Sequence, residues 1–326
     1  MKSSGDRIFD KDEDASVTIL LATYNGEKYI SEQIDSIREQ SFQDWTLLVR
    51  DDGSTDHTVN IIKAFCETDS RIHFVEDGLG HLGVVACFER LLEITQSGKS
   101  ADYICLSDQD DIWLPDKLEC QLNTMSALEE QYSGPVLIHT DLKVVDKSLN
   151  LIASSYVNLR RLSVPVERPY KTLAVQNYVT GCTIMLNRAL LEIVLPFPKG
   201  LLMHDWWLAL CAASAGYIHF MPEQTVLYRQ HGKNVLGAAK SVPVSYAEWW
   251  KNGQSEMKNV LAMSSILHDR LRKIRYAPAA STAFLGLLGS VPSLTGWQRL
   301  KLLAKIGIRR QAWYLSFILY LRLFLL

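Results

Sequence analysis

The sequence predicts an α/β protein with a mostly parallel, doubly wound sheet, followed by a helical tail. Short apolar runs rich in β-branched residues alternate with segments of helical periodicity, which indicates strands joined by right-handed crossover helices. Polar residues follow three of these runs and are Asp-rich after two of them, and the alternation stops near Pro115. With 326 residues, 48% of them hydrophobic, the chain is long enough to bury one large core.

The expected elements follow one another in a regular order. Strands are expected at 17–24, 45–51, 72–76, 103–106 and 136–139, and helices at 30–37, 54–65, 85–94 and 117–130. Ser54 or Thr55 is the expected cap of the second helix. Residues 146–180 lack clear periodicity, so we expect a mobile flap or connector there. In sheets of this kind, ligands gather at the carboxyl ends of the strands.

Charge and cysteine usage point to a reducing compartment. The six cysteines are scattered singly, without the close pairs of a zinc site or a disulfide framework. Met1 to Ser16 is polar and lacks the apolar run of a secretion signal. We therefore expect a cytoplasmic protein.

The C-terminal tail, residues 241–326, is basic and aromatic. Ten Lys or Arg and no Asp or Glu follow Asp269, although the whole chain has a net charge of -2, so residues 1–269 carry -12. The last apolar stretch, Trp313 to Leu326, is too short to span a bilayer and contains Arg322. We expect this tail to attach peripherally to the anionic inner face of a bacterial plasma membrane, rather than to nucleic acid. The residues suited to it are Trp297, Trp313, Tyr314, Tyr320, Arg299, Lys301, Lys305, Arg309 and Arg310. The alternative is a helical hairpin packed on the acidic body.

Three carboxylates within four residues, Asp108, Asp110 and Asp111, follow the fourth strand. They repel one another unless a cation or strong donors lie between them. Oxygen ligands favour Mg²⁺ or Mn²⁺, and either ion can neutralise charge on a leaving diphosphate. The alternative is an Asp-rich turn that caps the helix after Pro115.

The segment Asp51 to Asp56 follows the second strand and presents a similar choice. Its carboxylates are placed to accept hydrogen bonds from a base or ribose, and Tyr24 after the first strand can stack on a pyrimidine. The alternative is a helix N-cap with a tight turn.

Five motifs in order resemble those of GT-A glycosyltransferases of family 2. They are Thr23-Tyr24-Asn25-Gly26, Asp51-Asp52-Gly53-Ser54, Asp108-Gln109-Asp110-Asp111 with Ile112 to Pro115, His204-Asp205-Trp206-Trp207, and Tyr228 to Asn234. They also resemble bacterial rhamnosyltransferases that build rhamnose-containing cell-wall polysaccharides, and the resemblance covers about residues 17–240. It implies a GT-A fold with a donor-binding half at 17–115 and a mixed acceptor-side half at 116–240. Residues 1–16 form an N-terminal extension.

The resemblance also implies residue roles. The residues that it implies contact the nucleotide-sugar are Thr23, Tyr24, Asn25, Asp51, Asp52, Gly83, Asp108 and Gln109. Metal contacts fall to Asp108, Asp110 and His231, and acceptor contacts to Trp113, Gly181, His204 and Trp206. The implied donor is dTDP-L-rhamnose or a UDP-sugar, and the implied acceptor is a polymeric or polyprenyl-diphosphate-linked saccharide. Alternatives from the residues alone are a core role for Trp113 and a structural role for His231.

Asp205 is expected to be the general base. An inverting transfer needs one base to take the proton of the acceptor hydroxyl as it attacks the anomeric carbon. Trp206 and Trp207 beside Asp205 can raise its pKa by desolvation. The alternative is a helix start with Asp205 as its cap.

Two other classes of protein fit parts of the sequence. Residues 78–83 match GxGxxG and precede a helix, as in nicotinamide-dependent oxidoreductases, but they follow the third strand and leave the Asp clusters unexplained. A sugar-binding homologue that has lost turnover is the second alternative.

Overall fold

The computed structural model describes residues 17–98, 102–231, 246–274, 277–308, 310 and 313–325. The expected extension 1–16, motif residues 232–234 and Arg309 lie outside this part of the chain, as does the side chain of Trp313.

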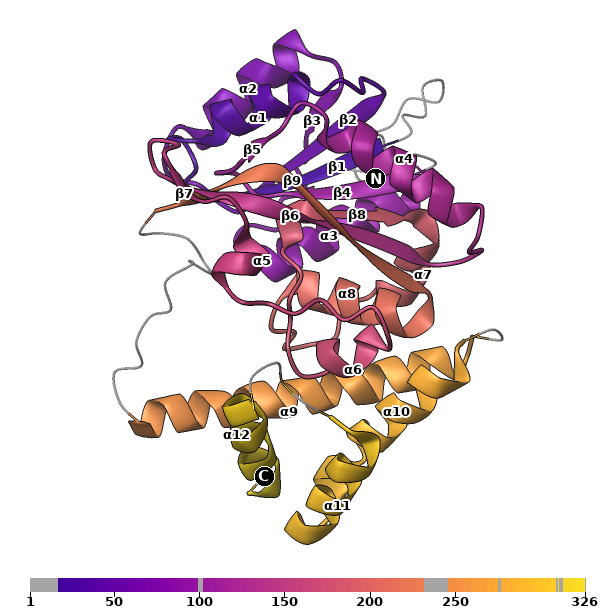
Figure 1. The fold of residues 1–326 in the computed structure, drawn as a ribbon. Coiled ribbons are helices and arrows are strands. Elements are labelled where there is room, and N and C mark those ends of the chain that lie inside the picture. Colours follow the sequence, from indigo (N-terminus) through magenta and orange to yellow (C-terminus); the bar gives the residue numbers. More distant parts are fainter. Residues whose placement is uncertain are drawn as a thin grey trace.

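The first four strands form a parallel sheet, as predicted (Figure 1). Strands β1 (Val17–Thr23), β2 (Trp45–Asp51), β3 (Ile72–Phe74) and β4 (Tyr103–Ser107) lie in the order β3-β2-β1-β4. They are joined through helices α1 (Ile30–Arg38), α2 (Thr58–Thr68) and α3 (Val84–Ser97). From β1 the chain passes to β2 and β3 on one side, and it then returns to β4 on the other side of β1. A topological switch point therefore lies between β1 and β4, and ligands of such sheets bind at this point.

Alternation along the strands builds two cores. On one face, Ile19 of β1 packs with Ile34 of α1. On the other face, Leu20 packs with Phe88 of α3 and, further along, with Trp207. Successive strand residues point to opposite faces, so apolar residues at nearly every position of β1 predict a strand buried on both sides.

The second half of the sheet is mixed. Strands β8 (Ile184–Asn187) and β6 (Val136–Asp146) add antiparallel pairs beside β4, and β9 (Tyr217–Gln230) runs parallel to β6. The short β5 (Ile112–Trp113) and β7 (Leu151–Ala153) pair with β9 and β6. The helices here are α4 (Lys117–Glu129), α5 (Tyr156–Leu159), α6 (Pro169–Leu173), the 3₁₀ turn η1 (Gly181–Thr183), α7 (Arg188–Val194) and α8 (His204–Ala215).

Two local expectations were wrong. Residues 146–180, expected to be a mobile flap or a connector, include β7, α5 and α6 and connect β6 to η1. Leu173 and Tyr178 are buried in the core, so the flap was the wrong alternative. Helix α2 starts at Thr58, where Asp56 accepts hydrogen bonds from the Thr58 N–H and hydroxyl. Ser54 and Thr55 lie before this turn and bond instead to Asp51 and Asn25.

The tail is helical and packs on the body. It contains α9 (Tyr246–Leu271), α10 (Ala279–Gly289), η2 (Val291–Ser293), α11 (Gly296–Ile306) and α12 (Trp313–Phe324). Leu267 and Leu285 join the core cluster that contains Trp207, and Arg270 donates to the carbonyls of Ile193 and Val194. Figure 1 shows α9 beneath α6 and α8, with α11 and α12 on the side away from the sheet. Among the described residues, none of the helices combines the length and apolarity that a membrane crossing requires.

Candidate active site

The loops after β1 and β4 are joined at the carboxyl edge of the sheet by Gln109. Its side-chain oxygen accepts from the Thr23 hydroxyl at 2.6 Å and the Tyr24 N–H at 2.9 Å, and its amide nitrogen donates to the Tyr24 carbonyl at 3.1 Å. Gly26 allows this approach, because a Cβ there would lie 2.3 Å from the Gln109 oxygen. Tyr24 is left with 47% of its surface exposed at the rim.

Asn25 and Asp51 shape the same rim through local contacts. The Asn25 side-chain oxygen accepts from the Thr55 N–H at 2.8 Å. Asp51 accepts from the N–H groups of Gly53 and Ser54, which is the tight turn considered above. Asn25 therefore links the loop after β1 to the loop after β2, and its own N–H donates to the Ser54 hydroxyl at 2.7 Å. Asp51 makes its contacts within the second motif.

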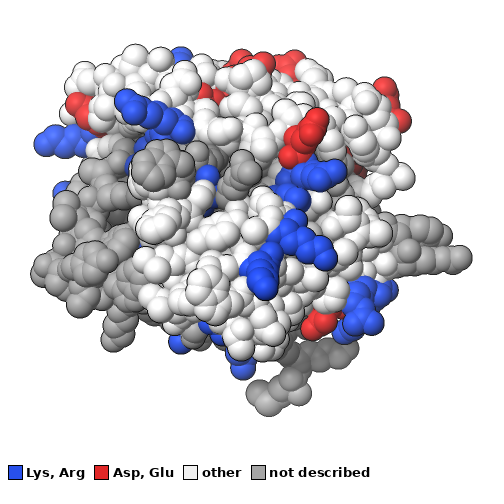
Figure 2. All heavy atoms as spheres, turned by 60° about the horizontal axis from the view of Figure 1, so that its bottom comes forward, with Lys and Arg blue, Asp and Glu red and all other residues white. Residues whose placement is uncertain are grey.

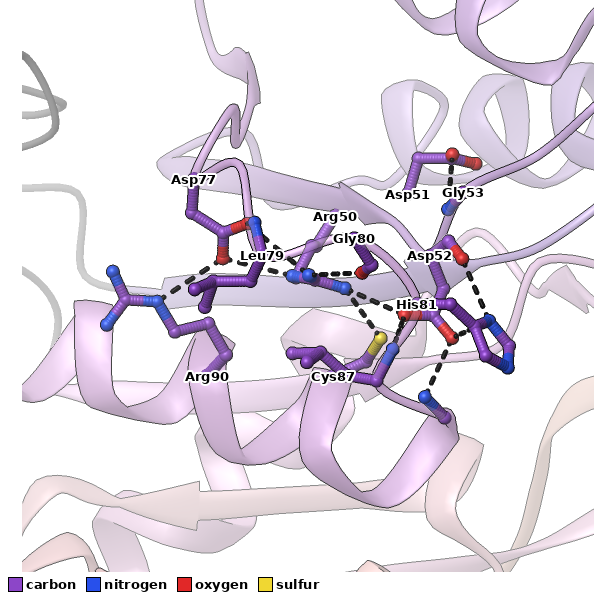
Figure 3. A network of polar contacts seen from close by, with 12 residues as sticks. Arg50, Asp51, Asp52, Gly53, Asp77, Leu79, Gly80, His81, Cys87 and Arg90 are labelled. Atoms are coloured by element: carbon purple, nitrogen blue, oxygen red, sulfur yellow. Dashed lines mark hydrogen bonds and ion pairs between the residues drawn. The ribbon is translucent and has the colours of Figure 1, made fainter.

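Asp52 is turned toward the glycine-rich loop, as Figure 3 shows. Only 4% exposed, it accepts from the N–H groups of Leu82 at 2.6 Å and Gly83 at 2.8 Å, and from Arg50 at 3.0 Å. Burial alone would raise the pKa of Asp52, but these donors hold it below its usual range. Its carboxylate thus fixes the loop instead of pointing outward toward a base.

These contacts exclude the oxidoreductase alternative. In a dinucleotide site, the N–H groups at the start of the helix hold the pyrophosphate. Here the N–H groups of Leu82 and Gly83 are occupied by the Asp52 carboxylate. An anionic pyrophosphate would compete with an existing negative charge for the same donors.

The acidic motif forms a cluster with Cys182, in which Asp111 and Cys182 are buried and Asp108 is half-buried. Ligand atoms of Asp108, Asp111 and Cys182 all lie within 4.8 Å of one another. Burial, and then the neighbouring Asp110 and Asp205, raise the pKa of Asp108 to about 7. Asp111 is fully buried, and one of its carboxylate oxygens accepts from the Arg229 N–H at 3.1 Å. The other oxygen has no hydrogen-bond partner among the described residues.

His231 at the end of β9 is paired with Asp110. Its Nε2 lies 2.7 Å from Asp110 Oδ2, and its ring stacks on Tyr29 with the centroids 5.0 Å apart. Arg229 supports both groups: its guanidinium lies 4.6 Å from the Tyr29 ring centroid and donates to the Asp110 carbonyl and to Glu32. Arg229 is 2% exposed, so these contacts are made away from water.

This donor set fits a hard divalent cation. Clustered carboxylates with raised pKa values, the buried Asp111 oxygen without a partner and the Asp110–His231 pair are the features that a cation would satisfy. Cys182 is a less suitable ligand, because burial raises its pKa well above the usual range and keeps it a neutral thiol.

Asp205 lies at the start of α8, next to the acidic cluster. It accepts from the Trp206 N–H at 2.6 Å and from Asn177 at 3.2 Å, and also from the Gly181 N–H. Burial raises its pKa to about 7, although these three donors lower it. Gly181 and Cys182 are consecutive residues of η1, so one turn touches both Asp205 and Asp111.

Gly181 packs closely against His204 and Asp205. A Cβ there would lie 3.1 Å from His204 Nε2 and 3.7 Å from Asp205 Cβ. His204 is buried against Phe88, with ring centroids 4.0 Å apart, and burial lowers its pKa to about 3. Within the part of the chain that the structure describes, neither ring nitrogen of His204 has a hydrogen-bond partner.

Two expected acceptor residues lie in the core instead. Trp113 is 2% exposed, packs with the cluster around Ile34 and lies under the Lys117 ammonium. Trp206 is 7% exposed and donates its ring N–H to the Leu173 carbonyl at 2.5 Å. Both rings pack in the core of the protein. For Trp113 this is the alternative role that the sequence left open.

Residues missed from the sequence support these side chains indirectly. They are Arg50, Asp77, Tyr29, Arg229 and Asn177. Arg229 lies within the fifth motif, and a charged residue among the apolar positions of a strand is a signal of a buried ion pair. Asn177 lies in a stretch without periodicity and gives no such signal.

Comparisons with known proteins find relatives in sequence and in fold. The model of the family described as Glycosyl transferase family 2 matches residues 18–194. Over 276 residues the chain is 29% identical to the dTDP-rhamnosyl transferase RfbG of Shigella flexneri, covering 78% of this chain and 88% of RfbG. It is 31% identical over 181 residues to the UDP-Glc:alpha-D-GlcNAc-diphosphoundecaprenol beta-1,3-glucosyltransferase WfgD of Escherichia coli, covering 55% and 63% of the two chains.

Two solved structures share the fold. The S. aureus TarS 1–349 complex with UDP-GlcNAc superposes with a TM-score of 0.52 at 17% identity, covering 90% of this chain and 82% of TarS 1–349. The mannosyltransferase PcManGT of Pyrobaculum calidifontis, solved with GDP-Man and Mn²⁺, gives 0.50 at 17% identity, covering 94% and 79%.

Proposed function

This chain belongs to glycosyl transferase family 2 and has the GT-A fold, and we propose that it is an inverting rhamnosyltransferase. The proposed donor is dTDP-L-rhamnose, and the proposed acceptor is a saccharide of cell-wall or surface polysaccharide synthesis. The name of RfbG supports the donor, since that likeness extends over most of both chains.

The observation that carries the proposal is the position of Asp205. Its carboxylate is buried, has a pKa raised to about 7, and shares the η1 turn with the acidic cluster. A base with its pKa near neutral pH can take a proton from an acceptor hydroxyl. Hydrogen bonds from Asn177 and from the Trp206 N–H hold the carboxylate in one orientation while the hydroxyl attacks the anomeric carbon.

The donor is expected to lie along the carboxyl ends of β1, β2 and β4. Tyr24 offers an exposed ring face to the base, and Asp108 and Asp110 lie at the diphosphate end. Asp108, Asp110 and His231 would hold Mn²⁺ or Mg²⁺, with Asp111 beneath them. When bound, the cation supplies positive charge that stabilises the leaving dTDP.

The outer face of the tail supports a membrane-bound acceptor, such as a polyprenyl-diphosphate-linked saccharide. Tyr314, Phe317, Leu321 and Leu325 are exposed at helical spacing along one side of α12 and just beyond its end. On α11, Trp297 is 71% exposed, and its ring contacts Phe324, so the two helices form one continuous surface.

Basic side chains lie around these apolar residues. Lys301 and Lys305 are exposed on α11, one and two helical turns beyond Trp297. Figure 2 shows this side of the molecule, with Lys and Arg spread among uncharged residues and fewer Asp and Glu. Such a surface suits anionic headgroups. Two of the basic residues that the sequence suggested for membrane contact bind within the protein instead. Arg299 donates to the Val291 carbonyl, and Arg310 donates to Glu256.

A donor panel tests the proposed activity. The purified chain, with Mn²⁺ and membranes as the source of acceptor, is offered dTDP-L-rhamnose, UDP-glucose and GDP-mannose, and release of nucleoside diphosphate is measured. We expect release that depends on both dTDP-L-rhamnose and the acceptor. Preference for UDP-glucose would overturn the donor assignment, and tight dTDP binding without release from any donor would identify a non-catalytic homologue.

A further inference from the structure

The loop that carries His81 is held in place by contacts within the protein. Arg50 is 1% exposed and donates to the Gly80 carbonyl and to Asp77, while Asp52 accepts from the N–H groups of Leu82 and Gly83 (Figure 3). The residues on both sides of His81 are therefore anchored. A side chain on such a loop is positioned before any ligand arrives, which lowers the entropic cost of binding.

The hydrogen bonds of His81 determine where its proton is. Nδ1 lies 3.0 Å from the Asp52 carbonyl oxygen and 2.9 Å from Asp52 Oδ2. A carbonyl and a carboxylate can only accept, so Nδ1 must donate. In the neutral imidazole the remaining nitrogen, Nε2, then carries a lone pair and acts as an acceptor.

This acceptor faces the open rim. The His81 side chain is 66% exposed, and Figure 3 shows the second ring nitrogen on the side away from Asp52. The ring centroid lies 5.2 Å from that of the exposed Tyr24, and the two planes are tilted by 51°. Together they form one corner, with an aromatic face from Tyr24 and a hydrogen-bond acceptor from His81.

Asp52 cannot supply that acceptor. Its two carboxylate oxygens already contact the Leu82 and Gly83 N–H groups, Arg50 and His81, and the residue is 4% exposed. A direct bond from Asp52 to a base would require the loop to give up at least one of these contacts.

We propose that His81 selects the base of the donor, with Nε2 accepting a hydrogen bond from N3–H of thymine or uracil while the base lies against Tyr24. This inference rests on the proposed function, since it concerns the nucleotide of the same donor. Thymine and uracil carry a donor at N3, whereas cytosine carries an acceptor there. With cytosine, the lone pair of N3 would face the lone pair of His81 Nε2, and the two would repel each other. His81 thus takes the part that the family resemblance gives to Asp52, and Asp52 acts as a positioning residue.

Calorimetric titration with dTDP, N3-methyl-dTDP and dCDP in the presence of Mn²⁺ tests this. We expect the wild type to bind dTDP roughly tenfold more tightly than either analogue, the ratio that one hydrogen bond of average strength provides. His81→Phe keeps an aromatic ring without an acceptor, so dTDP binding should weaken roughly three- to tenfold and the preference over dCDP should largely disappear.

His57→Phe is the matched control, because it replaces another exposed imidazole, that of His57 at the start of α2. It should retain the preference of the wild type. If His81→Phe retains it too, the inference fails while the proposed transferase activity stands. If the wild type binds none of the three nucleotides, the proposed function fails as well.

Discussion

Nε2 of His231 lies 2.7 Å from Oδ2 of Asp110, although 121 positions separate the two residues in the sequence. Arg229 makes this pairing possible, because it donates to the Asp110 carbonyl and lies over Tyr29, on which His231 stacks. In metal sites generally, partners that orient the ligands are as important as the ligands themselves, and we propose this role for Arg229.

Replacing Arg229 with Lys is expected to weaken cation binding. Lysine keeps the charge but lacks the planar group that contacts Asp110, Glu32 and Tyr29 together. We expect the Mn²⁺ concentration for half-maximal activity to rise about tenfold, with a smaller change in kcat at saturating Mn²⁺. Arg38→Lys, in an exposed ion pair on α1, is the control. An unchanged Mn²⁺ requirement in Arg229→Lys would contradict the positioning role.

Cation binding should depend on pH through Asp108. Burial, together with Asp110 and Asp205, raises the pKa of Asp108 to about 7. A cation binds the carboxylate and not the acid, so Mn²⁺ affinity should rise between about pH 6 and pH 8, with release of protons. Calorimetry in two buffers of different ionisation enthalpy measures this release. Equal affinity across the range, without proton release, would show that Asp108 is already ionised.

Asn177 should determine the pH at which kcat falls on the acid side of the pH profile. Its amide donates to the Asp205 carboxylate, which favours the charged form and lowers the pKa of Asp205 from the value that burial alone would give. Asn177→Ala removes this bond, so the pKa of Asp205 should rise and the acid limb of kcat should move to higher pH. Asn60→Ala, on the exposed side of α2, should leave the limb in place. If kcat decreases at every pH while the pH of the acid limb stays the same, Asn177 has a purely structural role.

The outer face of α11 and α12 should bind anionic membranes. Phe317→Ser with Leu321→Ser removes two exposed apolar residues from α12, so sedimentation with vesicles containing phosphatidylglycerol should decrease several-fold. The matched control is Leu151→Ser with Ile152→Ser, which changes exposed apolar residues on β7. Equal losses in both pairs would point to non-specific adsorption, and no loss in the α12 pair would remove this surface from the account.

The sequence predicted the parts of the fold that depend on local pattern. Apolar strands such as β1 and β2 have buried faces on both sides, and Ile30, Ile34 and Ile37 place one side of α1 against them. The meeting of the polar residues after β1, β2 and β4 at one edge of the sheet could also be predicted, because the carboxyl ends of parallel strands lie at the same edge. Thr23 indeed pairs with Asp51 in register.

Side-chain directions at the site could not be derived in the same way. Whether Asp52 points toward a base or toward residues 82 and 83 depends on the path of a loop held by Arg50, Asp77 and Asp52 itself. The core positions of Trp113 and Trp206 likewise depend on which side of β5 and α8 faces the sheet. Helix α8 is apolar on most of its surface and is buried from His204 to Ser214, so periodicity does not indicate which of its sides faces the sheet.

The most direct test of the account is the transfer rate of Asp205→Asn, measured beside its affinity for dTDP and Mn²⁺. Asparagine keeps the size and the contact with the Trp206 N–H but cannot take a proton, so we expect kcat to fall by a factor of about 10² to 10⁴. Binding of dTDP and Mn²⁺ should stay close to that of the wild type. A variant that transfers sugar at the wild-type rate would contradict the assignment of Asp205 as the base.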